Sequence, residues 1–186
     1  KDIKKLPDRK LFQKLELLII DEVSMLKADI LDSIDKFLRK NRSENKPFGG
    51  VQLLLVGDLF QLPPVVPIQE WNILKEKGYT SPYFFSSFSL QKMSLIPVEL
   101  TSVYRQDDLS FIKLLNQVRT GDNLESVTAE LNTRCSQYVD KEIDITLTLT
   151  LTCTNFLADQ INNKELQKLT FKEYLFNGKI EGKFAI

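Results

Sequence analysis

The hydrophobic pattern near the start of the chain predicts a strand that ends in two acids. In "LELLIIDEVSM", four consecutive aliphatic residues form Leu17–Ile20. Such a run is typical of a strand buried on both faces of a parallel α/β sheet. Asp21 and Glu22 follow it directly. Ligands of open α/β sheets bind at the carboxyl ends of the strands, so this pair is placed for chemistry, with a solvated acidic turn as the alternative.

The residues that follow continue the pattern with a helix and a second strand. Apolar side chains recur with helical spacing from Leu26 to Leu38. After the loop "NKPFGG", the apolar run Val51–Val56 predicts another buried strand, and it too leads to an acid, Asp58. The order strand, helix, strand is that of a parallel α/β fold.

Later segments predict further elements. "LIPVELT" indicates a third strand near Leu95–Leu100, and Pro97 favours an edge or irregular position for it. Apolar residues from Phe111 to Val118 predict a helix that ends before Gly121, and Leu124–Arg134 predicts another.

The last part of the chain combines an alternating segment with a polar helix. Residues Ile145–Thr152 alternate between apolar residues and threonine, which predicts a strand of period two. A helix is expected from about Phe156 to Leu169. In "FNGKIEGKF", Gly178 and Gly182 are typical of hairpin turns.

Composition narrows the class of protein. The 186 residues are 42% hydrophobic, enough for one large core or two small ones. Lys plus Arg and Asp plus Glu both number 25, so no whole-chain field attracts nucleic acid or an anionic membrane. The absence of histidine excludes a His-based triad and a His-containing zinc site. Isolated Cys135 and Cys153 favour a reducing compartment.

The apolar runs and the start of the chain indicate where the protein acts and whether the sequence is a piece of a longer one. No apolar run approaches the roughly 18 residues that span a membrane, and we expect no membrane partner. The chain opens at Lys1, directly before a predicted strand, and we expect it to be a piece of a longer protein.

A second motif, "VGDLFQLPPVV", follows the second predicted strand. Proline fixes φ and removes backbone donors, so Pro63 and Pro64 stiffen this loop and present Gln61 beside the sheet edge. A third motif, "LTSVYRQ", carries Arg105. An acid pair, a loop glutamine and a lone arginine are the groups that nucleoside triphosphate hydrolysis uses.

These motifs, together with "LTCTNFLADQIN", resemble the Pif-type superfamily 1 DNA helicases over nearly the whole chain. The resemblance implies an α/β fold made of two incomplete RecA-like P-loop NTPase domains divided near Thr101. Residues 1–101 would end the first domain, and residues 102–186 would begin the second. It also implies an ATP-dependent 5′-to-3′ DNA helicase.

The resemblance assigns roles to the motif residues, with ATP and Mg²⁺ as cofactors. Asp21 would hold Mg²⁺ through water, and Glu22 would polarise the water that attacks the γ-phosphate. Gln61 would sense the γ-phosphate. Arg105 would act as an arginine finger from the second domain. Tyr104 and Gln106, the neighbours of Arg105, would bind the nucleotide, and Tyr104 would pack near its base.

One family motif is missing from these residues. A complete helicase carries a phosphate loop of the form GxxxxGKS or GxxxxGKT before the acid strand, and the sequence contains neither. We therefore expect the isolated chain not to hydrolyse ATP. The alternative is a non-catalytic DNA-binding or protein-interaction module derived from a helicase.

Single-stranded and forked DNA are the partners that the resemblance implies. Phe60, Pro63 and Pro64 would belong to the surface that faces the strand, where an aromatic ring stacks on a base. Thr154 and Asn155 would bind backbone phosphate, with a helix N-cap as an equal alternative.

The family also implies work in DNA repair, recombination and telomere maintenance. Its location would be cytoplasmic and nucleoid-associated in bacteria, and nuclear or mitochondrial in eukaryotes. Without the central phosphate-loop strand, we expect the chain either to self-associate through an exposed sheet edge or to be part of a longer chain whose remainder is disordered or cleaved.

Overall fold

The computed structural model describes residues 3–104, 106–139, 149–172, 174, 176 and 178. They form two compact units, Lys1–Asn132 and Thr133–Ile186. The elements, in chain order, are α1 (Lys10–Lys14), β1 (Leu17–Ile20), the 3₁₀ turn η1 (Val23–Met25), α2 (Ala28–Arg42), η2 (Pro47–Gly50), β2 (Gln52–Leu55), α3 (Ile68–Glu76), η3 (Phe84–Ser86), η4 (Leu90–Lys92), α4 (Leu109–Thr120), α5 (Leu124–Val139) and α6 (Asn155–Leu166).

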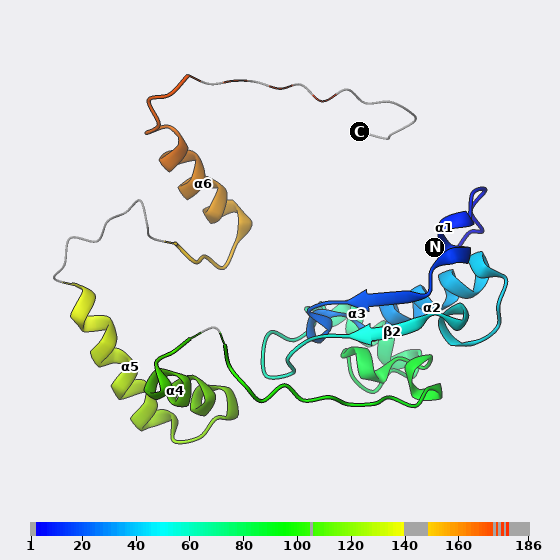
Figure 1. Cartoon of the computed structure of the whole chain (residues 1–186), viewed down its shortest axis with the longest axis horizontal. Coiled ribbons are helices and arrows are strands. Elements are labelled where there is room, and N and C mark those ends of the chain that lie inside the picture. The colour runs from blue at the N-terminus through cyan, green and yellow to red at the C-terminus, as the bar shows by residue number, and fades with distance from the viewer. Residues whose placement is uncertain are drawn as a thin grey trace. The chain divides into compact units, whose positions relative to one another are not determined.

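The first unit is built on a parallel strand pair, as the sequence predicts. Leu17 of β1 pairs with Gln52 of β2, and the register continues to Ile20 and Leu55. Figure 1 shows the two arrows side by side and pointing the same way. The first strand has the predicted bounds, and the second is shorter by one residue at each end.

Among the described residues, one face of this sheet is covered and the other is largely exposed. Side chains such as Leu18 and Leu53 pack against a buried cluster that includes Leu31 and Leu38 of α2. On the opposite face, Ile19 remains 56% exposed and Leu54 47% exposed. The prediction of strands buried on both faces is therefore wrong for this chain, because α2 supplies cover from one side.

The predicted third strand near Leu95–Leu100 is also wrong, since the described residues contain only the β1–β2 pair. The segment 93–98 and residues 52–55 of β2 instead both line a groove of about 670 Å³. A strand is defined by its pairing. Here Pro97 lacks a donor, and the groove separates the segment from the nearest strand edge.

The predicted helices are present, with modest shifts of their ends. α2 extends beyond Leu38, α5 beyond Arg134, and α6 begins and ends earlier than expected. α4 ends where the sequence places its end, because Gly121 adopts φ 79° and closes the helix with a left-handed cap. Its start is capped by Asp108, whose carboxylate accepts the Phe111 N–H at 3.0 Å.

Two predictions fall partly outside the described residues. Of the alternating segment, residues 145–148 lie outside, and residues 149–152 form no strand. The hairpin expected around Gly178 and Gly182 lies mostly outside as well. The domain division near Thr101 stays a prediction.

Candidate functional site

The two acids form a tight turn at the carboxyl end of β1. Asp21 and Glu22 are both exposed. Glu22 adopts the left-handed conformation with φ 50°, which is uncommon for a residue other than glycine. The Asp21 carboxylate accepts the Glu22 N–H at 2.9 Å. The turn thus presents both carboxylates to solvent and holds Glu22 in a backbone conformation of the kind that gathers at functional sites.

A close approach of backbones joins this turn to the end of β2. The Val23 N–H donates to the Val56 carbonyl at 2.9 Å. A Cβ added at Gly57 would lie 3.0 Å from the Val23 nitrogen and 3.2 Å from the Ser24 nitrogen. A side chain is disfavoured here, because its Cβ would press on the backbone that follows the acid pair. The acid pair and the second motif therefore start from one sheet edge.

Asp58 organises the loop that carries Gln61. Its carboxylate accepts the Phe60 N–H at 3.0 Å and the Gln61 side-chain amide at 3.3 Å. The Gln61 N–H also donates to the Asp58 carbonyl, at 3.1 Å. The hydrogen bond from Phe60, with further ones from Gln61 and Arg119, outweighs the effect of burial and holds the pKa of Asp58 below its usual value. Asp58 is therefore ionised in the neutral range.

A residue distant in the chain completes this loop. The Arg119 guanidinium, near the end of α4, lies 3.2 Å from the Asp58 carboxylate. The same guanidinium lies 4.9 Å from the centre of the Phe60 ring, within the range of a cation–π contact.

The predicted DNA-facing residues of this loop differ in exposure. Phe60 is 63% exposed, and Pro63 is exposed as well. Pro64 is buried. Phe60 and Pro63 therefore offer surface to a partner, whereas Pro64 serves the packing of the loop.

The third motif lies in an extended segment before α4. Tyr104 is 92% exposed. The Gln106 side-chain oxygen accepts the Asp107 N–H at 3.0 Å and the Asp108 N–H at 3.4 Å, ahead of the helix. Arg105 lies outside the described residues.

In the second unit, Thr154 caps α6. Its hydroxyl accepts the Leu157 N–H at 3.3 Å, and Asn155 is the first helical residue. The N-cap that the sequence offered as one alternative is confirmed. Phosphate binding by Thr154 and Asn155 stays a prediction.

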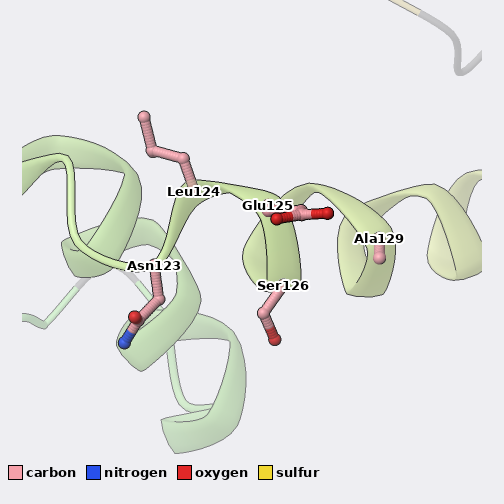
Figure 2. Close-up of a pocket in the computed structure, with 5 residues that line it drawn as sticks. All are labelled: Asn123, Leu124, Glu125, Ser126 and Ala129. Atoms are coloured by element: carbon pink, nitrogen blue, oxygen red, sulfur yellow. The ribbon is translucent and has the colours of Figure 1, made fainter.

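A pocket at the start of α5 is lined by none of the predicted site residues. Figure 2 shows a pocket of about 510 Å³ at the start of α5, where Leu124 points away from Asn123 and Ser126. Among the residues with described positions, no three His, Cys, Asp or Glu side chains gather as metal ligands. No helix in the described part of the chain is long and apolar enough to cross a membrane.

The sequence motifs single out the acid pair and Gln61, but they do not indicate how Asp58 and Arg119 organise the Gln61 loop. For Asp58, the spacing to Phe60, two residues on, is a local signal for a turn that captures a backbone N–H. Arg119 carries no such signal, because its partner lies 61 residues earlier in the chain.

Comparison with known proteins decides the family. The model of the family described as PIF1-like helicase matches residues 2–129. The chain belongs to the PIF1-like helicase family. It therefore carries the α/β fold predicted for it, a partial RecA-like fold of the kind found in Pif1 helicase structures.

The named relatives are much longer than this PIF1-like chain. The ATP-dependent DNA helicase PIF1 of Homo sapiens is 38% identical over 163 residues, which cover 86% of this chain and 23% of the human protein. The Saccharomyces cerevisiae protein of the same name is 32% identical, with 89% of this chain and 18% of the yeast protein covered.

One solved structure that is similar to this chain contains a nucleotide analogue and DNA. The crystal structure of Pif1 helicase from Bacteroides in complex with ADP-AlF3 and ssDNA is 34% identical, with a TM-score of 0.80. It matches over 92% of this chain and 40% of its own length.

Proposed function

We propose that this chain is part of an ATP-dependent DNA helicase that couples ATP hydrolysis to 5′-to-3′ movement on single-stranded DNA and to duplex unwinding. One observation carries the proposal. The hydrogen bond from Val23 to the Val56 carbonyl brings the Asp21–Glu22 turn and the Gln61 loop to one edge of a parallel sheet, where α/β proteins bind nucleotides. The names of the relatives, and the bound ADP-AlF3 of the Bacteroides protein, support it.

The acids of this edge suit the proposed chemistry. The Glu22 carboxylate is exposed at the strand end and would orient the attacking water as a hydrogen-bond acceptor. Gln61, held by Asp58, would contact the γ-phosphate with its amide. Arg105 would neutralise charge that develops during phosphoryl transfer, and its neighbours Tyr104 and Gln106 would contact the nucleotide.

The residues present also fit a magnesium ion. Mg²⁺ is commonly bound through one or two carboxylates, with water and substrate phosphates as its remaining ligands, and it neutralises charge on those phosphates. Asp21 offers an exposed carboxylate at the strand end. The lack of a three-ligand cluster among the described residues is compatible with that mode of binding.

The proposed partners are single-stranded and forked DNA. The exposed ring of Phe60 would stack on a base, beside Pro63. Thr154 and Asn155 at the start of α6 would contact backbone phosphate. Roles in DNA repair, recombination and telomere maintenance would follow from this activity, in the nucleoid of a bacterium or in the nucleus or mitochondria of a eukaryote.

The test of the proposed function is a Glu22→Gln substitution in the full-length protein. Glutamine keeps the shape and removes the charge that orients the water, so ATP turnover should fall at least about a hundredfold while ATP binding changes little. Single-turnover hydrolysis and equilibrium nucleotide binding measure the two effects. Glu16→Gln is the matched control, because Glu16 is an exposed glutamate at the opposite end of β1.

Turnover of the Glu22→Gln protein within a few-fold of wild type would remove Glu22 from the catalytic role. If the full-length wild type also failed to hydrolyse ATP but bound DNA, the non-catalytic module would be the better description.

We propose in addition that the isolated 186 residues self-associate through the free edge of β2. Gln52 and Val56 donate their N–H groups to the carbonyls of Glu16 and Ile20, both at 2.9 Å. Alternation along the strand directs the backbone groups of Leu53 and Leu55 to the other edge, which borders the groove. Among the described residues no strand pairs there, and such an edge is adhesive.

Light scattering with intact mass measurement tests this association. Oligomers whose proportion rises with concentration are the expected result. A stable monomer of 21.5 kDa at all concentrations would contradict it.

A further inference from the structure

Asp58 lies at the centre of a small network that joins the loop after β2 to helix α4. One carboxylate oxygen, Oδ1, accepts the Phe60 N–H at 3.0 Å and the Arg119 side-chain N–H at 3.2 Å. The other, Oδ2, accepts the Gln61 side-chain amide at 3.3 Å. The position of the Gln61 amide and that of the Arg119 guanidinium are therefore set by the same carboxylate.

The Arg119 side chain makes two contacts that suit a planar cation. Its guanidinium pairs with Asp58 and lies 4.9 Å from the centre of the Phe60 ring. A guanidinium presents its edge to a carboxylate and its face to an aromatic ring, whereas the ammonium of lysine is a point charge. Both contacts act on the loop that carries Gln61.

This ion pair is too exposed to matter much for stability. The side chains of Arg119 and Asp58 are 44% and 23% exposed, and pairs of this kind contribute little to the free energy of unfolding. A change in the geometry of the Gln61 loop would instead affect the rate of ATP hydrolysis, because phosphoryl transfer depends on the placement of each group. The function of the pair is therefore to be sought in positioning.

We propose that Arg119 is a positioning residue for Gln61, acting through Asp58, and that it links the nucleotide-sensing loop to helix α4. The inference rests on the proposed role of Gln61 at the γ-phosphate. α4 begins shortly after the segment that carries Tyr104 and Gln106, so the ion pair connects the second motif with the helix that follows the third. A movement of α4 that broke the pair would remove Arg119 from the carboxylate that holds the Gln61 amide.

The test compares kinetic constants of the full-length protein in DNA-stimulated ATP hydrolysis. Arg119→Met removes the charge and keeps the length of the side chain. It should lower kcat about fivefold to tenfold, which is the range expected for coupled neighbours, and change KM for ATP less than about twofold. Arg119→Lys should recover part of kcat, since it restores the charge without the planar face. Lys113→Met, a loss of positive charge elsewhere on α4, is the control and should match wild type.

A second genetic background separates positioning from a structural effect. In a Gln61→Ala protein, Arg119→Met should lower kcat less than about twofold, because the group that Arg119 positions is already gone. Single-turnover measurements at high enzyme concentration keep the slower rates of this background measurable. Thermal melts of all variants should agree with the wild type, since the pair is exposed.

Two results would overturn the proposal. An equal loss of kcat in both backgrounds would show that Arg119 acts independently of Gln61, while leaving the proposed function of the acid pair intact. Wild-type activity of the Gln61→Ala protein would remove Gln61 from the proposed function and would overturn the positioning role with it.

Discussion

The Asp32 carboxylate on α2 accepts a 2.7 Å hydrogen bond from the Ser87 hydroxyl, which lies 55 residues later in the chain. The same carboxylate accepts the Tyr79 hydroxyl at 2.7 Å, the Ser89 N–H at 2.9 Å and the Phe88 N–H at 3.2 Å. Asp32 is 3% exposed. This buried acceptor holds the segment that contains η3 against the helix that covers the sheet.

Loss of this acceptor should destabilise the first unit. Asp32→Ala leaves several buried donors without a partner, so the free energy of unfolding should fall by about 3 kcal/mol. Urea unfolding of the 186-residue chain measures it through Trp71, the single tryptophan, which packs against a cluster that includes Tyr79. Asp107→Ala is the control, because Asp107 is exposed, and it should change the value by less than about 0.5 kcal/mol. Equal losses in both variants would contradict the assignment.

The contribution of Asp32 to the free energy of unfolding should depend on pH. Burial by itself raises the pKa of Asp32, but hydrogen bonds from Ser87, Ser89 and Tyr79 outweigh it and leave the pKa below its usual value. The unfolded-state pKa of aspartate is about 3.9. A carboxylate whose pKa is lower in the folded state stabilises the fold at pH values above about 3.9, and this stabilisation is lost as the pH falls through the folded-state pKa. The stability difference between wild type and Asp32→Asn should therefore shrink below about pH 4. Urea titrations from pH 7 downward measure it, and a constant difference would count against this account.

A methyl group at Gly57 should disturb the acid turn. Gly57→Ala places a Cβ about 3.0 Å from the backbone nitrogen of Val23, so the turn has to shift. In the full-length protein, ATP turnover should fall at least about tenfold, because small misplacements of catalytic groups are costly. Gly178→Ala is the control, since no described atom lies within 4 Å of its added Cβ. Steady-state ATP hydrolysis by the two variants tests this prediction. Equal rates of hydrolysis in Gly57→Ala and Gly178→Ala would argue against a tight contact at Gly57.

Arg105 should act only when both helicase domains meet. Arg105→Ala in the full-length protein should depress DNA-stimulated ATP hydrolysis and unwinding together, because a finger from the second domain works in the closed cleft. Arg105→Lys should rescue poorly, since lysine lacks the planar fork. Parallel ATPase and strand-separation assays measure both activities. An alanine variant with unchanged stimulated turnover would exclude the role.

Local patterns of the sequence determined the elements that carry the candidate site. The aliphatic run of β1, the helical spacing of α2 and the apolar run of β2 each depend on neighbours within a few residues, and all three elements form as predicted. The acids at the strand ends follow from the same patterns, because parallel strands bring their carboxyl ends to one edge. Gly121 ends α4 for a reason that is equally local.

Tertiary structure decided what depends on partners far away in the chain. The segment 95–100 has the composition of a strand, yet pairing requires an adjacent strand edge, and the groove beside β2 separates the two. Glu22 adopts its left-handed turn where the backbone beyond it is held by Val56. Arg119 gains its significance from Asp58, 61 residues away. Periodicity reports which face of an element is apolar, but it carries no information about which distant group meets that face, because that choice is made by packing.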